Sequence, residues 1–219
     1  MKRSGIGILL VILAASGYAQ TTTKTFYVND ERKRDVVTFT SKAPLEMILG
    51  TTGHIVGFVE TDPADIMNTR ARFEVDLATL KTGIDMRDGH MRRQYLETEK
   101  YPKAIFELTK VVKASQPTLE NQKPVELMVE GNFSVHGVTK PITIPLTIAY
   151  FQESEETKAK LPGDMIRIEG AWDILLSDYK ISRPQFVILK LDDKQKINID
   201  VFGSTGSPAV TFAESKQAQ

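Results

Sequence analysis

Apolar and polar residues alternate along several long stretches of this chain of 219 residues. From Arg70 to Leu77 every odd position is apolar and every even position before Leu77 is charged. The same pattern recurs at residues 125–136, 142–149, 166–176 and 197–201, and in shorter form at 37–39, 55–59 and 106–112. A period of two is typical of a strand that buries one face and exposes the other. The chain therefore predicts an all-β fold of about eight or nine strands, several of them longer than usual.

Long strands of this kind bury their apolar faces in one of two ways. Two sheets stack face to face, or one antiparallel sheet closes into a barrel. A barrel of eight strands is either filled by its own side chains or holds one slender ligand. The alternation leaves both architectures open, but it predicts these inward side chains: Phe39, Phe73, Val75, Leu77, Phe106, Leu108, Leu127, Phe133, Val135, Ile144, Leu146, Ile168 and Trp172.

Turn and helix signals separate the strands. Gly137 predicts a hairpin turn, and Pro145, which has no N–H to donate, predicts an edge or a bulge within its strand. One helix is expected from about residue 87 to 96, between two strands, where it would pack over an end or a side of the barrel. Met86, Met91 and Tyr95 would share one face of this helix.

Residues 1–19 have the pattern of a secretory signal peptide. Lys2 and Arg3 precede an apolar stretch at 6–15, and small residues near Ala19 fit a signal peptidase site. An N-terminal membrane anchor is the alternative, but a run of ten apolar residues is shorter than the ~20 that span a bilayer. We expect cleavage after Ala19 and a periplasmic or secreted mature protein without a transmembrane segment.

The mature chain is expected to form one domain. Residues 20–34 would lead into an all-β domain at 35–203, and residues 204–219, rich in Ser, Thr, Gln and Ala, would form a flexible tail. Because the chain contains no cysteine, its hydrophobic core must hold the fold without disulfides. Without Lys2 and Arg3, 26 of the 28 basic residues remain against 28 acidic ones. This balance argues against a nucleic-acid partner, which would favour a basic excess.

No residue pattern indicates catalysis or metal binding. The histidines, His54, His90 and His136, are dispersed, and neither an HExxH motif nor a cysteine accompanies them. The sequence also has no Gly-x-Ser-x-Gly nucleophile elbow and no phosphate-binding loop. Carboxylates such as Glu74 and Glu126 alternate with apolar residues, so we expect them on a solvated outer face. We predict neither an enzyme nor a bound metal or cofactor.

The sharpest polar cluster is Arg87-Asp88-Gly89-His90. In a functional interpretation, Arg87 or His90 lies at the barrel mouth and binds the polar head of an apolar ligand. In a structural interpretation, Asp88 accepts backbone N–H groups in the first helical turn, while Arg87 and His90 hold the helix to the barrel. The residues alone favour the structural interpretation, and they also favour a turn-stabilising role for His136.

Three segments, at residues 82–91, 101–106 and 136–143, carry a resemblance to a known family. In their order and spacing they resemble the YceI-like family of exported bacterial proteins, which look like lipocalins and bind long polyisoprenoid lipids. The resemblance spans about residues 35–202. Its matching positions are Phe39, Gly57, Asp62-Pro63, Thr82-Gly83, Arg87, Asp88, His90, Tyr101-Pro102, Phe106, Gly131 and His136-Gly137-Val138-Thr139-Lys140-Pro141.

The resemblance implies a lipocalin-like antiparallel β-barrel of about eight strands with one short helix. It also implies that the barrel binds a polyisoprenoid, such as a quinone or a prenyl phosphate. The candidate ligand-binding residues are then Phe39, Phe73, Val75, Leu77, Arg87, His90, Phe106, Leu108, Phe133, Val135, Ile144, Leu146 and Trp172. Two other hypotheses stay open: a packed structural or stress-response barrel without ligand, and an enzyme that acts on a lipid or small oxidant through His90. A homodimer is also left open.

Overall fold

The computed structural model describes residues 22–183 and 191–212. These ranges form ten β-strands: β1 (Lys24–Val28), β2 (Val36–Ala43), β3 (Glu46–Thr52), β4 (Ile55–Asp62), β5 (Asp65–Asp76), β6 (Lys103–Ala114), β7 (Pro124–Val135), β8 (Val138–Phe151), β9 (Met165–Leu175) and β10 (Lys194–Ser204). The helix α1 (Asp85–His90) continues as a π-helical turn, Met91–Tyr95, and α2 (Glu155–Lys158) is a single turn. Short 3-10 turns occupy Leu77–Thr79 and Leu176–Tyr179.

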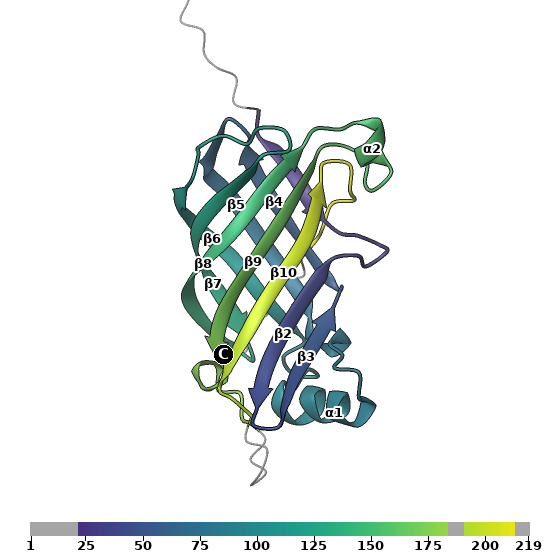
Figure 1. The fold of residues 1–219 in the computed structure, drawn as a ribbon, viewed down its shortest axis with the longest axis vertical. Coiled ribbons are helices and arrows are strands. Elements are labelled where there is room, and N and C mark those ends of the chain that lie inside the picture. Colours follow the sequence, from purple (N-terminus) through teal and green to yellow (C-terminus); the bar gives the residue numbers. More distant parts are fainter. Residues whose placement is uncertain (1–21, 184–190, 213–219) are drawn as a thin grey trace, which may run out of the picture.

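Eight of these strands close a ring (Figure 1). The order is β1-β4-β5-β6-β7-β8-β9-β10, and β10 pairs back to β1 through Tyr27 and Ser204. The remaining hairpin, β2–β3, pairs with the other half of β10, from Gln195 to Asp200. The predicted all-β antiparallel barrel of eight strands is therefore confirmed, and one hairpin extends its wall. The strand β1 lies within residues 20–34, where the sequence suggested only a lead-in, because five residues alternate too briefly to stand out.

The long strands follow the predicted alternation, except in β6. We expected Phe106, Leu108 and Val112 to share one face. The β6–β7 register instead shifts twice, between Leu108 and Lys110 and between Val111 and Lys113. Each bulge places one extra residue in β6 and changes the face that the following residues present. Val111 is therefore buried, whereas Val112 is exposed.

Two predictions about turns and prolines are supported. His136 and Gly137 both have positive φ angles, 53° and 73°, and they connect β7 to β8 in a two-residue hairpin, as the right-handed twist of the strands requires. Pro145 pairs with Met128 of β7, and the β8–β9 ladder begins only at Leu146. At Pro145, β8 therefore has no partner on its β9 side, so the N–H that proline lacks costs the sheet little.

The two ends of the barrel differ. At the α2 end, the upper end in Figure 1, a packed core fills the barrel with fully buried side chains, among them Phe26, Val28, Val125, Ile166 and Val201. At the opposite end, α1 lies beside the β2–β3 hairpin. The helix and its π-helical turn cover part of this α1 end, as predicted. Met91 and Tyr95 pack on the barrel core, but Met86, which we expected on the same face, is exposed.

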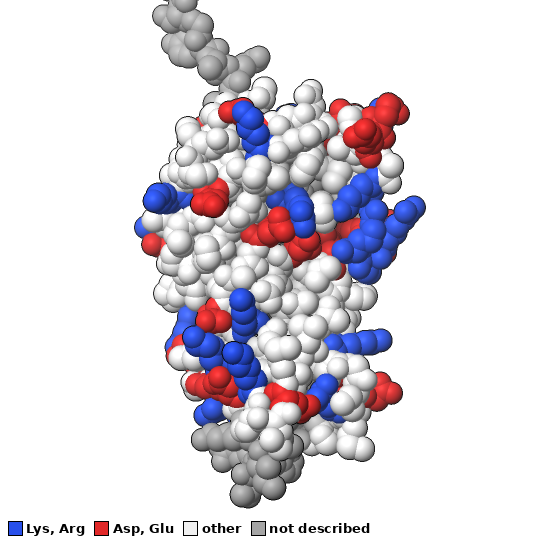
Figure 2. Space-filling view, in the orientation of Figure 1, with Lys and Arg blue, Asp and Glu red and all other residues white. Residues whose placement is uncertain are grey.

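Charged side chains of both signs lie next to one another on the outer face (Figure 2). Cross-strand ion pairs such as Arg167–Asp200, at 2.7 Å, and Lys194–Asp173, at 3.0 Å, account for part of this arrangement. Exposed pairs of this kind contribute about 0–1 kcal/mol each, so they favour solubility more than stability.

Glu74 departs from the predicted solvated outer face. Its side chain is only 3 % exposed, because Arg72 and Lys103 lie over it and both form ion pairs with it. The segment after β10 adds cover nearby: the Phe212 ring lies 5.9 Å from the Phe58 ring, and Arg72 lies over Phe212. The first part of the predicted tail, residues 205–212, therefore contacts the barrel wall, and residues 213–219 lie outside the described residues.

Candidate ligand-binding site

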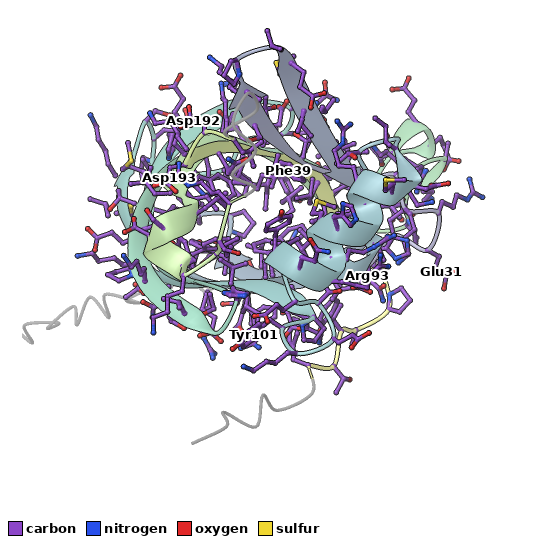
Figure 3. All side chains as sticks on the ribbon, turned by 90° about the horizontal axis from the view of Figure 1, so that it is seen from below. Glu31, Phe39, Arg93, Tyr101, Asp192 and Asp193 are labelled. Carbon is purple, nitrogen blue, oxygen red and sulfur yellow. The ribbon has the colours of Figure 1, made fainter. Side chains whose placement is uncertain are left out.

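An elongated cavity of about 500 Å³ occupies the barrel between the packed core and the α1 end. Its walls are almost wholly apolar and come from β2 to β10, from α1 and its π-helical turn, and from the 3-10 turn that follows β9. Figure 3 looks into the barrel from the α1 end, where the strands surround the lumen and the labelled Phe39 lies inside the ring. A cavity of this size falls within the usual range of small-molecule sites.

All thirteen predicted ligand-binding residues line this cavity. They are Phe39, Phe73, Val75, Leu77, Arg87, His90, Phe106, Leu108, Phe133, Val135, Ile144, Leu146 and Trp172. Leu127 and Ile168, which we also predicted to point inward, line it as well. The sequence thus located the lumen correctly, whereas contact of these residues with a ligand stays a prediction.

Three phenylalanines lie against the wall because glycines stand opposite or diagonal to them. A Cβ atom added to Gly57 would lie 2.4 Å from Cδ1 of Phe73, and one added to Gly131 would lie 2.4 Å from Cζ of Phe106. Phe39 makes the same kind of contact with Gly50, its partner in the β2–β3 ladder. Since each ring occupies the space that a neighbouring side chain would take, the rings line the lumen without filling it.

On one wall of the lumen, aromatic side chains pack edge to face. The Phe133 ring lies 6.5 Å from Trp172 and 5.5 Å from Tyr179, and both pairs are T-shaped. This geometry is favourable for aromatic pairs, so it holds Trp172 in a defined position on the cavity wall.

At the α1 end, each of the three guanidinium nitrogens of Arg87 donates one hydrogen bond to the protein. Its Nε donates to Thr82 Oγ1 at 2.8 Å, one Nη donates to the Thr82 carbonyl at 3.1 Å, and the other donates to Glu46 Oε2 on β3 at 3.2 Å. These contacts tie the loop before α1 to the β2–β3 hairpin. They support the structural interpretation of Arg87, although its side chain still lines the rim of the cavity.

Asp88 is buried and fixes the same loop, but not as predicted. Its Oδ1 accepts hydrogen bonds from the N–H and the hydroxyl of Thr82, at 2.7 and 2.6 Å, and not from the first turn of the helix. Burial raises the pKa of the Asp88 carboxyl, but the bonds from Thr82 and the charges of Arg92 and Arg87 outweigh it. The net pKa lies below its ordinary value, so Asp88 is ionised at neutral pH.

His90 and His136 have separate environments. His90 is exposed at the rim of the cavity. The His136 ring lies 2.8 Å from Glu97 through Nε2 and 4.6 Å from the Tyr101 ring, as expected for a turn-stabilising residue. Within residues 22–183 and 191–212, no three His, Asp or Glu side chains are grouped so that they could hold a metal ion.

Two buried polar residues on the wall, Ser41 on β2 and Gln195 on β10, were not among the predicted site residues. They stand opposite each other in the β2–β10 ladder. The signal was present, because Ser41 shares the inward face of Phe39, and Gln195 shares that of Ile197. Polar residues at inward positions interrupt an apolar pattern, and such interruptions identify candidate ligand contacts.

The described residues therefore form a closed antiparallel barrel with an apolar cavity, packed at one end, an architecture with room for one small apolar ligand. The family to which it belongs follows from its sequence. A family model described as the YceI-like domain matches residues 27–202, and this chain belongs to that family.

Relatives and solved structures agree with this membership. A UPF0312 protein of Vibrio parahaemolyticus is 33% identical over 98 residues, which are 44% of this chain and 48% of that protein, so the chain matches about half the length of this relative. The crystal structure of Burkholderia cenocepacia BcnA has a TM-score of 0.62 at 17% identity, covering 80% of this chain and 99% of that one. A polyisoprenoid binding domain from Saccharophagus degradans has a TM-score of 0.59 at 16% identity, covering 82% and 97%. At these identities the two structures establish the shared fold.

Among the helices within the described ranges, none is long and apolar enough to cross a membrane.

Proposed function

We propose that this protein is an exported carrier that sequesters an elongated apolar ligand in its barrel. The ligand would be a polyisoprenoid lipid, such as a quinone or a prenyl phosphate, and the role would be carriage or storage in the periplasm or outside the cell. The observation that supports this proposal most directly is the apolar cavity of about 500 Å³, packed at one end and rimmed by polar residues at the other.

The physical basis is the transfer of hydrocarbon from water to the lumen. Each CH₂ group that leaves water contributes about 0.8 kcal/mol, and part of this gain offsets the entropy lost on binding. A long, thin chain suits a long, thin cavity because its hydrocarbon can contact the apolar wall along its whole length. The fold shared with the polyisoprenoid binding domain from Saccharophagus degradans adds support for this class of ligand.

Export is part of the proposal and depends on the signal-like pattern of residues 1–19, which lie outside the described residues. Sequestration requires no catalysis, metal or cofactor. An enzyme working through His90 would need a second group poised on substrate, and His90 stands at an exposed rim without a neighbouring acid or base in the described hydrogen bonds. A packed structural barrel would require a lumen filled with side chains, and the cavity counts against it.

The test is native mass spectrometry, with solvent extraction, of the mature protein purified from a bacterial periplasm without detergent. We expect a co-purifying mass that partitions into hexane and matches an isoprenoid series. A protein that stays free of ligand, even after incubation with quinones and prenyl phosphates, would refute the proposal.

Two tryptophan variants make this test specific to the lumen. Ala71 lines the cavity, so Ala71→Trp should reduce the amount of co-purifying lipid by narrowing the lumen. Thr143 is exposed and stands beside the inward Ile144 on β8, so Thr143→Trp adds the same side chain outside the barrel and should retain the lipid. Far-UV circular dichroism checks that both variants fold.

A further inference from the structure

The apolar lumen contains polar atoms that the described protein does not satisfy. The Ser41 side chain is completely buried, yet its Oγ has no hydrogen-bond partner among the described residues. The indole Nε1 of Trp172 is buried without a partner in the same way. Both residues line the cavity. A buried polar atom without a partner lowers stability, so native proteins usually leave one only where a water or a ligand completes the bond.

Ser41 does not stand alone. Gln195 faces it across the β2–β10 ladder, is 4 % exposed, and lines the same cavity. The Gln195 Nε2 donates to the Asp192 carbonyl at 2.8 Å, which anchors the amide at this level of the barrel. Directly opposed residues of an antiparallel pair bring their Cβ atoms to about 5 Å. The hydroxyl and the amide therefore form one uncharged polar pair on an otherwise apolar wall.

This pair lies near the α1 end. Ser41 is two residues before the end of β2, and Phe39, the next inward residue toward the packed core, is seen inside the ring in Figure 3. Trp172 lies at the level of Phe39, because both pair with Ile197 of β10. It is therefore one inward position closer to the packed core than Ser41. A ligand with its tail toward the packed core would therefore pass its hydrocarbon along Trp172, whose Nε1 it leaves without a partner, and place its head beside Ser41.

The cavity offers little to a charged head. Among its described lining residues, only Arg87 and His90 have basic side chains. All three nitrogens of Arg87 already donate to Thr82 or Glu46, and the Glu46 carboxylate at the rim repels anions. A phosphate moved to the level of Ser41 would lose its hydration without gaining a counter-ion.

We infer that the lumen selects an uncharged ligand whose hydroxyl or carbonyl head hydrogen-bonds the Ser41–Gln195 pair once the buried Ser41 hydroxyl turns toward the lumen. The inference rests on the proposed function and narrows it from polyisoprenoids in general to those with a neutral head. Ser41 donates to a carbonyl or accepts from a hydroxyl, and the side-chain amide of Gln195 has the same two capacities.

The experiment compares three probes that differ mainly in the head group: geranylgeraniol, geranylgeranyl diphosphate and the hydrocarbon phytane. Trp172 is the chain's one tryptophan and lines the cavity, so its fluorescence reports binding in the lumen. The full mature protein is delipidated and titrated with each probe. We expect the alcohol to bind more tightly than the diphosphate.

Variants then locate the head group. Ser41→Ala should weaken binding of the alcohol about 2- to 12-fold, the net worth of one neutral hydrogen bond, and should leave phytane binding unchanged. Ser134→Ala is the matched control, because Ser134 bonds Thr139 beside the β7–β8 hairpin and does not line the cavity. It should leave the affinity for every probe unchanged. A thermal melt verifies that Ser41→Ala folds, as expected when an unpaired hydroxyl is removed.

The outcomes separate the inference from the proposed function. Tighter binding of the diphosphate than of the alcohol, or an unchanged affinity of Ser41→Ala for the alcohol, overturns the inference while carriage of a polyisoprenoid stands. If none of the three probes binds the folded protein, both the inference and the proposed function fail.

Discussion

Replacing Asp35 with asparagine should stabilise this protein at neutral pH. Asp35 lies directly before β2, where the chain crosses from β1, and its side chain is 3 % exposed. Its Oδ1 accepts the Phe202 N–H at 2.9 Å, but Oδ2 is buried without a partner among the described residues. Burial, with the nearby Asp30 carboxylate, raises the pKa of Asp35 from 3.8 to about 6, although the Phe202 N–H, Lys160 and Arg34 oppose the rise.

The size of the expected gain in unfolding free energy follows from the difference between the folded and unfolded pKa of Asp35. The folded carboxyl keeps its proton up to about pH 6, whereas the unfolded chain releases it near pH 3.8. The stability that this group contributes is therefore complete below pH 3.8 and is lost as the pH rises through 6. A rise of about two pKa units means that the ionised Asp35 lowers the free energy of unfolding by about 3 kcal/mol at neutral pH. This value is an upper limit, because water that reaches the carboxylate during local motion reduces it, so we expect a gain of about 1–3 kcal/mol.

The assay is urea unfolding at pH 7.5 and pH 4, followed by Trp172 fluorescence. Asparagine keeps an oxygen that accepts the Phe202 N–H and carries no charge. The gain of Asp35→Asn should therefore appear at pH 7.5 and nearly vanish at pH 4. Asp173→Asn is the control, since it removes a carboxylate from an exposed pair with Lys194 and should change stability by less than about 1 kcal/mol. An equal effect of Asp35→Asn at both pH values, or a loss at pH 7.5, would refute the reasoning.

Other variants test the site and the walls by the same unfolding assay. Asp88→Asn should destabilise the protein by about 1–3 kcal/mol at pH 7, because charged hydrogen bonds to the loop weaken. The Asp88 pKa is lowered in the folded protein, so the stability difference between wild type and variant should shrink when acid protonates this carboxyl. A stability difference that grows in acid would contradict this. Gly137→Ala should cost about 1–3 kcal/mol, since φ is 73° and the new Cβ would lie 2.6 Å from Tyr101 Cε1; a neutral effect would show that the turn relaxes. Ile166→Ala in the packed core should cost about 2–5 kcal/mol, and Leu146→Ala on the cavity wall about half as much, because Leu146 already borders open space; equal losses would argue against an open lumen.

Much of the fold follows from local sequence. Alternation alone predicted that Phe73, Val75 and Phe133 point inward, because successive residues of a strand must face opposite sides. The turn after β7 was equally readable, since Gly137 readily adopts the positive φ angle that a two-residue hairpin needs. Such features depend on neighbours in the chain, so a single sequence suffices to predict them.

Other features depended on contacts between distant segments. The two bulges of β6 reversed the expected faces of Val111 and Val112, and Glu74 became buried only because Lys103 of the next strand and Arg72 cover it. Alternation carries no signal for a bulge or for a covering side chain. Predictions of the face of a residue are therefore least secure where partner strands differ in length or register.

The sequence by itself determined the all-β class and the apolar character of the interior, because both follow from a period of two. Motifs in a constant order indicated the family, and the resemblance to that family implied the barrel. Tertiary structure alone decided three other matters: that β1 closes the ring, that Arg87 bonds Thr82 and Glu46, and that Ser41 stands opposite Gln195. Each of these depends on which strands lie side by side after the chain has closed on itself. The energy of that closure is shared among residues far apart in the chain, so no local pattern records it.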